Sequence, residues 1–233
     1  MKTAFITGGT KGIGYGVAES LLREGYAVAF TGRNAQGVKE AEAALSRGFE
    51  GKVLGLTADV RDPASLEKAV AAVLETFGGL DVVIANAGVG VFKSIGELTA
   101  DDWKDTIDTN LTGVFYTVKA TLDEVIRRKG YVITIASLAG TNFFEKGTAY
   151  NASKFGLVGF TQALMLDMRD KDVKVSTIMP GSVATYFNNH TPSGADAWKI
   201  QPEDIGQMVA DLLKMNPRTL PSKIEVRPAK LPR

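Results

Sequence analysis

Short apolar runs rich in β-branched residues alternate along this chain with longer segments in which apolar residues recur at helical spacing. Such alternation is typical of α/β proteins, in which helices cover both faces of a parallel sheet. The runs 82–84 and 131–133 show little alternation between apolar and polar residues, as expected for central strands buried on both faces. The pattern therefore predicts an α/β fold with one parallel sheet between two layers of helices.

The individual elements follow from the same pattern. We expect strands at about residues 3–7, 26–31, 52–57, 80–85, 130–136, 173–179 and 222–227, and helices near 12–24, 34–47, 63–77, 101–128, 148–170 and 202–214. Asp62-Pro63 and Thr99-Ala100-Asp101-Asp102 supply capping and first-turn residues for two of these helices. Because no repeat, low-complexity tract or linker interrupts the pattern, we expect one domain over residues 1–233.

The composition limits the partners and the chemistry. The formal net charge is +1, and the 27 basic and 26 acidic residues form no long blocks, so we expect neither nucleic acid nor membrane as a partner. The absence of cysteine and the single histidine, His190, argue against a metal site and a Ser-His-Asp site, and we interpret His190 as a surface loop residue. The N-terminus leads into a strand without the apolar region of a signal peptide, so we expect a cytoplasmic protein.

A glycine-rich turn, Thr7 to Gly14, lies between the first strand and the first helix. Its glycines allow a tight turn and a close approach of the backbone to a pyrophosphate, which the free N–H groups of the helix N-terminus then bind. The spacing Gly8-x3-Gly12-x-Gly14 differs from G-x-G-x-x-G and lacks the ending of a P-loop. We expect dinucleotide binding here; the alternative is that the glycines only turn a tight corner.

The end of the second strand indicates which dinucleotide is bound. A free ribose 2′-hydroxyl usually meets a carboxylate there, whereas a 2′-phosphate is better bound by arginine. This chain has Arg33 and no carboxylate, and Lys11 adds a second positive charge in the glycine turn. The pair favours NADP(H), with NAD(H) possible; the alternative is that both are ordinary solvated side chains.

Tyr150 and Lys154 are four residues apart in a predicted helix, so their side chains lie on one face. The lysine charge favours phenolate over phenol, and we expect it to lower the pKa of Tyr150. A tyrosine tuned in this way can act as a general acid or base near neutral pH.

The chain resembles the short-chain dehydrogenase/reductase family, from Lys2 to about Pro228. The motifs that carry the resemblance occur in the family's order: Thr7 to Gly14, Asp59-Val60, Asn86-Ala87-Gly88, Asn110, Ser137, Tyr150-x3-Lys154 and Pro180-Gly181-x3-Thr185. The resemblance implies a Rossmann-type three-layer sandwich with a seven-stranded parallel sheet, order 3-2-1-4-5-6-7, and a short substrate-binding loop at about 182–200. Ala85 departs from the pattern, because the family commonly has a further asparagine there.

The resemblance also implies roles for single residues. Tyr150 would be the general acid or base, Lys154 would tune it and hold the nicotinamide ribose, Ser137 would orient the carbonyl, and Asn110 would hold a water that links Lys154 to solvent. The residues implied to contact the cofactor are Gly8, Thr10, Lys11, Gly12, Ile13, Gly14, Arg33, Asp59, Val60, Asn86, Ala87, Gly88, Tyr150, Lys154, Pro180, Gly181, Val183 and Thr185.

Several of these residues have a purely structural alternative. Ser137 fits a turn, Asp59 fits a cap for the turn before Asp62, and Thr185 fits a loop cap. For the substrate wall we name the aromatic loop residues Phe92, Phe143, Phe144, Tyr186 and Trp198, together with Val91. Aromatic residues in loops also serve local packing, which is the alternative for this set.

We therefore expect an NADP(H)-dependent oxidoreductase that transfers hydride between nicotinamide and a small carbonyl or secondary alcohol. One alternative is an epimerase or dehydratase of the extended relatives, against which stand the glycine spacing and the lack of a C-terminal substrate domain. A second is a nucleotide sensor without turnover. From the family resemblance we also expect a homo-tetramer or homo-dimer that forms through helices 101–128 and 148–170.

Overall fold

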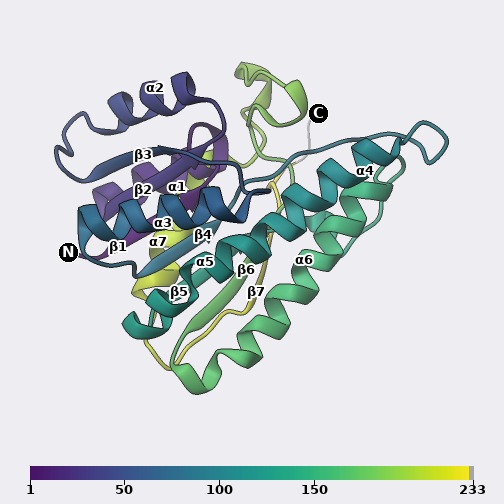
Figure 1. Ribbon diagram of the computed structural model, residues 1–233. Helices are drawn as coiled ribbons and strands as arrows, with labels where there is room; N and C mark the ends of the chain where they lie inside the picture. Colours follow the sequence, from purple (N-terminus) through teal and green to yellow (C-terminus); the bar gives the residue numbers. More distant parts are fainter. Residues whose placement is uncertain (231–233) are drawn as a thin grey trace.

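The predicted strands form one sheet in which every described pairing is parallel. The computed structural model describes residues 1–230 (Figure 1). The strands are β1 (Thr3–Thr7), β2 (Ala27–Gly32), β3 (Val53–Thr57), β4 (Val82–Ala85), β5 (Tyr131–Ile135), β6 (Lys174–Pro180) and β7 (Lys223–Val226). Their order, β3-β2-β1-β4-β5-β6-β7, confirms the predicted fold class and topology.

Alternate residues of the strands enter two separate apolar layers. In β1, Ala4 and Ile6 belong to one core cluster and Phe5 to the other, and in β4 Val83 faces away from Ile84. All five of these side chains are fully buried. The sheet is therefore covered on both faces, which explains why its strands are apolar almost throughout.

Helices on each face of the sheet provide the remaining side chains of the two core clusters. One face carries α1 (Gly12–Arg23), α2 (Ala35–Leu45) and α7 (Pro202–Lys214), whereas the opposite face carries α3 (Pro63–Phe77), α5 (Gly113–Arg128) and α6 (Thr148–Asp167). Figure 1 shows the second set in front of the sheet. Asp62 caps α3 by accepting a hydrogen bond from the Ala64 N–H, as the sequence predicts.

The predicted helix 101–128 is helical along its whole length but is not α-helical throughout. The structure has α4 (Ala100–Ile107), which begins with a capping box of Thr99 and Asp102, then a π-helical turn, η1 (Asp108–Thr112), and then α5. The interruption contains Asn110, which is completely buried. Asparagine competes for backbone groups in a helix, and π-turns are often found at functional sites.

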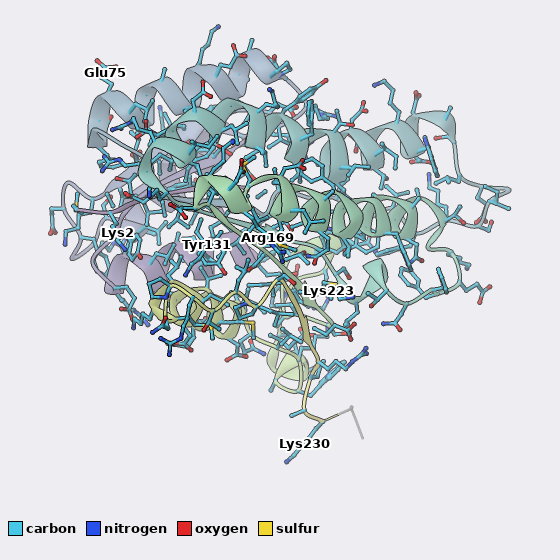
Figure 2. All side chains as sticks on the ribbon, turned by 90° about the horizontal axis from the view of Figure 1, so that it is seen from below. Lys2, Glu75, Tyr131, Arg169, Lys223 and Lys230 are labelled. Atoms are coloured by element: carbon cyan, nitrogen blue, oxygen red, sulfur yellow. The ribbon has the colours of Figure 1, made fainter. Side chains whose placement is uncertain are left out.

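The carboxyl ends of the strands lie at one edge of the sheet, where chain connections from β1 and β4 diverge to opposite faces. Such a switch point is where open α/β sheets bind ligands. Lys2, Tyr131 and Lys223 mark the opposite, amino ends of β1, β5 and β7 (Figure 2). Within residues 1–230, no helix has the length and apolar character needed to span a bilayer.

Candidate active site

A cleft of about 1200 Å³ opens at the carboxyl ends of the strands. Ligand pockets for small molecules typically have about 300–1000 Å³, so this cleft has room for a dinucleotide and part of a second molecule. The predicted residues that line it are Gly8, Thr10, Lys11, Gly12, Ile13, Arg33, Val60, Asn86, Ala87, Gly88, Phe92, Ser137, Phe143, Phe144, Tyr150, Lys154, Pro180, Gly181, Val183, Thr185, Tyr186 and Trp198. The fold thus brings together segments that are far apart in sequence.

Asn86, directly after the neighbouring strand β4, fixes the glycine turn by hydrogen bonds. Its side-chain amide donates to the carbonyls of Thr7 at 3.0 Å and Gly8 at 2.9 Å, while the Thr7 hydroxyl accepts from the N–H groups of Asn86 and Ala87. A Cβ at Gly14 would lie 2.3 Å from the Gly8 carbonyl oxygen and 2.6 Å from Asn86 Nδ2. The close packing under the turn leaves no room for a side chain at position 14, so glycine is required there. Gly14 itself does not line the cleft.

The turn presents the start of α1 to the cleft. Lys11 is the N-cap residue, and its side chain makes no capping hydrogen bond. The first backbone N–H groups of a helix attract an anion, because they have no partners within the helix and lie at the positive end of the helix dipole. Lys11 and Arg33 are both exposed and both line the cleft. This part of the cleft therefore suits the phosphates of a dinucleotide.

Asp59 lies outside this arrangement. It does not line the cleft, whereas Val60 does. Its carboxylate accepts hydrogen bonds from the Arg61 guanidinium, one of them at 2.6 Å, and its backbone carbonyl accepts from the Asp62 N–H. The bond to Arg61, helped by the charge of Arg33, holds the pKa of Asp59 below its usual range. These contacts support the role in the turn that was left open above, and a cofactor contact of Asp59 stays a prediction.

Tyr150, Lys154 and Ser137 meet at the centre of the cleft. Tyr150 and Lys154 lie in the first two turns of α6, and Lys154 Nζ is 5.7 Å from the Tyr150 ring centroid. Lys154 is 5% exposed, and its Nζ donates to the Ile135 carbonyl at 3.0 Å. Ser137 follows β5, and its hydroxyl accepts from the Ala139 N–H at 3.1 Å. The end of β5 therefore positions both the lysine and the serine.

Burial dominates the electrostatics of this group. It raises the pKa of Tyr150 to about 12, although a hydrogen bond with the Ser137 hydroxyl acts in the opposite direction. It also lowers the pKa of Lys154 to about 8, because the ammonium is removed from water. The pKa of Tyr150 is therefore raised and not lowered as the sequence predicts, and loss of solvent is the main cause.

Asn110 lies behind the cleft and links two of its walls. Its side-chain oxygen accepts from the Val89 N–H at 2.8 Å, and its amide donates to the Val89 carbonyl at 2.9 Å and to Ser153 Oγ at 3.1 Å. Ser153 Oγ in turn donates to the Tyr150 carbonyl at 2.8 Å. The side chain therefore positions the loop after β4 against α6, and the water-holding role of Asn110 stays a prediction.

The structure adds residues that the sequence did not single out. Phe187, Asn142 and Arg227 line the cleft, whereas Val91 does not. Phe187 lies in the predicted substrate-binding loop, so its aromatic side chain could have identified it from the sequence as a residue of the cleft. Arg227 follows β7, and only the pairing of β7 with β6 places it here. His190 also lines the cleft, and its Nε2 is 2.9 Å from Asp196 Oδ2.

Across residues 1–230, no group of three or more His, Cys, Asp or Glu side chains is arranged to hold a metal ion. The titratable side chains of the cleft are instead the phenols of Tyr150 and Tyr186, the imidazole of His190, and the lysines and arginines. The donors that face the cleft thus suit a phosphate-bearing organic ligand better than a bound cation.

Known proteins resemble both the sequence and the fold. Residues 2–196 match the family model described as short chain dehydrogenase. An uncharacterized oxidoreductase from Staphylococcus aureus strain MW2 is 33% identical over 97% of each chain. An alcohol dehydrogenase from Thermococcus sibiricus, complexed with 5-hydroxy-NADP, is 31% identical with a TM-score of 0.93, over 100% of this chain and 99% of that one.

A short chain dehydrogenase from Burkholderia cenocepacia J2315, in complex with NADP, has a TM-score of 0.88 at 28% identity, over 97% of this chain and 96% of that one. The family match extends over most of the chain and includes the glycine turn, Ser137, Tyr150 and Lys154. The chain belongs to the short-chain dehydrogenase family of oxidoreductases.

Proposed function

We propose that this protein is an NADP(H)-dependent oxidoreductase that interconverts a carbonyl compound and the corresponding alcohol. The observation that carries the proposal is the convergence of Tyr150, Ser137 and Lys154 in the cleft that also contains the glycine turn. A general acid, an oxygen-orienting hydroxyl and a cation lie together next to a site suited to a dinucleotide.

Each residue has a defined task in carbonyl reduction. A bound reduced nicotinamide supplies hydride, and the protein supplies the proton and the orientation. Tyr150 donates its phenolic proton to the carbonyl oxygen, while the Ser137 hydroxyl orients that oxygen and stabilises its developing charge. With its pKa raised to about 12, Tyr150 stays protonated at neutral pH, which suits the acid role. Lys154 would hold the nicotinamide ribose.

The preference for NADP(H) rests on charge. Arg33 follows β2 at the place where a 2′-phosphate would lie, and Lys11 borders the same part of the cleft. The similar proteins from Thermococcus sibiricus and Burkholderia cenocepacia are complexed with 5-hydroxy-NADP and NADP. Both observations support binding of the phosphorylated cofactor by this chain.

The direct test is a panel of ketones and aldehydes with NADPH and with NADH, followed by the absorbance of the reduced cofactor. We expect NADPH to support turnover with the higher kcat/KM. Binding of NADPH without turnover of any carbonyl compound would contradict the enzyme proposal and favour a nucleotide sensor. Equal Kd values for NADPH and NADH would contradict the cofactor preference.

We also infer a homo-dimer or homo-tetramer that forms through α5 and α6. Phe115 on α5 is 44% exposed and Leu166 on α6 is 58% exposed, which leaves apolar surface on both helices. Light scattering would measure the mass in solution, and a monomeric mass would contradict the inference. The cytoplasmic location stays a prediction that cell fractionation can check.

A further inference from the structure

Three phenyl rings surround the catalytic tyrosine. The ring centroid of Phe92 is 5.3 Å from that of Tyr150, Phe187 is at 5.7 Å and Phe144 at 6.4 Å. Phe92 also contacts the other two in edge-on geometry, at 5.6 Å from Phe144 and 6.3 Å from Phe187. We call Phe92, Phe144 and Phe187 the aromatic collar. All three line the cleft.

The collar is assembled from three separate segments of the chain. Phe92 follows β4, Phe144 precedes α6, and Phe187 begins the short helix η4 (Phe187–Asn189). A Cβ at Gly90 would lie 2.4 Å from Phe187 Cε1, so the missing side chain of Gly90 makes the space in which this ring packs. The ring of Phe187 is therefore held by close packing against the backbone.

The collar leaves apolar surface exposed at the reaction centre. Phe144 is 45% exposed and Phe187 is 36% exposed, although both rings pack against other aromatic side chains. Exposed apolar surface inside a cleft is typical of a ligand-binding groove, because binding of an apolar ligand removes that surface from water. Aromatic rings further favour aromatic ligands, which they contact edge-on or in offset stacks.

Most cations of the cleft already have a carboxylate partner or lie where the cofactor would bind. Within the described residues, no Asp or Glu lines the cleft, and its cations are Lys11, Arg33, Lys154, Lys199 and Arg227. Lys199 is paired with Asp196 at 2.6 Å and Arg227 with Glu225 at 3.0 Å. Lys11 lies in the glycine turn and Arg33 directly follows β2, in the part of the cleft where the cofactor would bind. The collar is thus the feature that an incoming substrate meets beside the catalytic hydroxyls.

We propose that the substrate is a neutral ketone or aldehyde whose carbonyl carbon carries an aryl group, with the aryl ring bound in the aromatic collar. This inference rests on the proposed function and names the substrate class of the same site. In the reducing direction the carbonyl carbon gains a hydride from the reduced nicotinamide and the oxygen gains the Tyr150 proton. The C=O bond becomes CH–OH, the nicotinamide is oxidised, and Tyr150 recovers its proton from solvent.

The test compares three methyl ketones of similar size with the full-length protein and NADPH. Acetophenone has a neutral aryl group, cyclohexyl methyl ketone has a saturated six-membered ring of similar size, and 4-acetylbenzoate adds a carboxylate. We expect kcat/KM for acetophenone to exceed that for cyclohexyl methyl ketone by about 10-fold, because aromatic contacts exceed simple burial. We expect 4-acetylbenzoate to be the poorest substrate, since the phenyl rings of the collar offer its carboxylate no hydrogen-bond donor.

Substitutions in the collar test whether its rings cause the preference for the aryl ketone. Phe187→Leu keeps apolar contact without the ring and should remove most of the preference for acetophenone over cyclohexyl methyl ketone. Phe144→Leu tests a second ring, should Phe187→Leu impair folding. Phe49→Leu is the matched control, because Phe49 packs against the core beneath α2 and does not line the cleft. An unchanged preference in both collar variants overturns the proposal.

A binding measurement separates this inference from the proposed function. Calorimetry of acetophenone and cyclohexyl methyl ketone, each titrated into protein saturated with NADP+, needs no turnover. Tighter binding of acetophenone that Phe187→Leu abolishes supports the collar even if no ketone is reduced, in which case only the proposed function fails. Equal binding or equal turnover of the two ketones, or preference for 4-acetylbenzoate, overturns the aryl-ketone proposal while leaving a reductase intact.

Discussion

Lys199 Nζ and Asp196 Oδ1 form an ion pair at 2.6 Å in which the carboxylate side chain is only 7% exposed. The other carboxylate oxygen is 2.9 Å from His190 Nε2 and accepts from the Ser193 N–H at 2.8 Å. These contacts hold the pKa of Asp196 well below its usual range, with Lys199 as the main cause. One carboxylate therefore organises residues 190–199, three of which line the cleft.

The Asp196→Asn variant should loosen this segment. It removes the charge that holds Lys199 and His190, so we expect the KM for the carbonyl substrate to rise by about 10-fold with kcat less affected. Limited proteolysis should also cut within residues 186–199 faster than in the unmodified protein. Asp170→Asn is the control, because Asp170 forms an ion pair with Lys171 on the surface. Unchanged KM and unchanged proteolysis would contradict the role of Asp196.

The Tyr150→Phe variant should lose turnover while retaining the cofactor. It removes the proton donor without changing the ring that packs against the collar, so we expect kcat to fall by about 10²-fold to 10⁴-fold. Fluorescence titration with NADPH should give a Kd close to that of the unmodified protein. The partly exposed Tyr116 of α5 lies outside the cleft and provides the control Tyr116→Phe. Substantial residual activity in Tyr150→Phe would refute the general-acid role.

The Arg33→Ala variant should erase most of the discrimination between NADPH and NADH. Loss of a charge-assisted contact to phosphate should raise the Kd of NADPH by about 10-fold or more and leave the Kd of NADH nearly unchanged. Arg23→Ala is a suitable control, because Arg23 is exposed on α1 and paired with Glu19. A parallel loss of affinity for both cofactors would show that Arg33 does not read the 2′-phosphate.

The Lys154→Met variant should be inactive yet more stable at neutral pH. The folded protein lowers the Lys154 pKa from 10.5 to about 8, so burial of the cation costs about 3 kcal/mol below pH 8. Between pH 8 and 10 the unfolded chain keeps a proton that the folded chain has lost, so stability rises with pH. Lys154→Met should lack this rise.

Urea unfolding at several pH values between 7 and 10 measures this difference. Tyr150 acts in the opposite direction but at higher pH, because its pKa is raised from 10.0 to about 12 and its contribution is lost only above pH 10. Lys39→Met, at an exposed position of α2, is the control and should follow the unmodified protein. Identical pH slopes for Lys154→Met and the unmodified protein would contradict the burial cost.

The Asn110→Ala variant should be destabilised and less active. It leaves the partly buried Val89 N–H and carbonyl without their side-chain partner, which costs about 1 kcal/mol. Asn110 also donates a hydrogen bond to Ser153 of α6, and Ser153 donates in turn to the Tyr150 carbonyl. We therefore expect the substitution to displace Tyr150 and to lower kcat. Urea unfolding and kcat measure the two effects, and an unchanged stability would show that the Val89 contacts are dispensable.

Local pattern was sufficient for most of the secondary structure. The seven strands lie within two residues of their predicted bounds, and Asp62 and Thr99 cap their helices as predicted. Apolar runs and capping residues act over a few neighbouring positions, so a single sequence displays them directly. The π-helical turn that contains Asn110 did not follow from the helical spacing of the apolar residues, and only the poor helix propensity of asparagine pointed to it.

What the sequence determined by itself was the class of fold, the glycine turn and the spacing of Tyr150 and Lys154, since each follows from residue type and short-range periodicity. The tertiary structure decided the aromatic collar, the place of Arg227 in the cleft and the exclusion of Asp59 from it. It also reversed the direction of the Tyr150 pKa shift. The physical reason is that burial and long-range packing depend on the strand order, which joins segments that a linear pattern keeps apart.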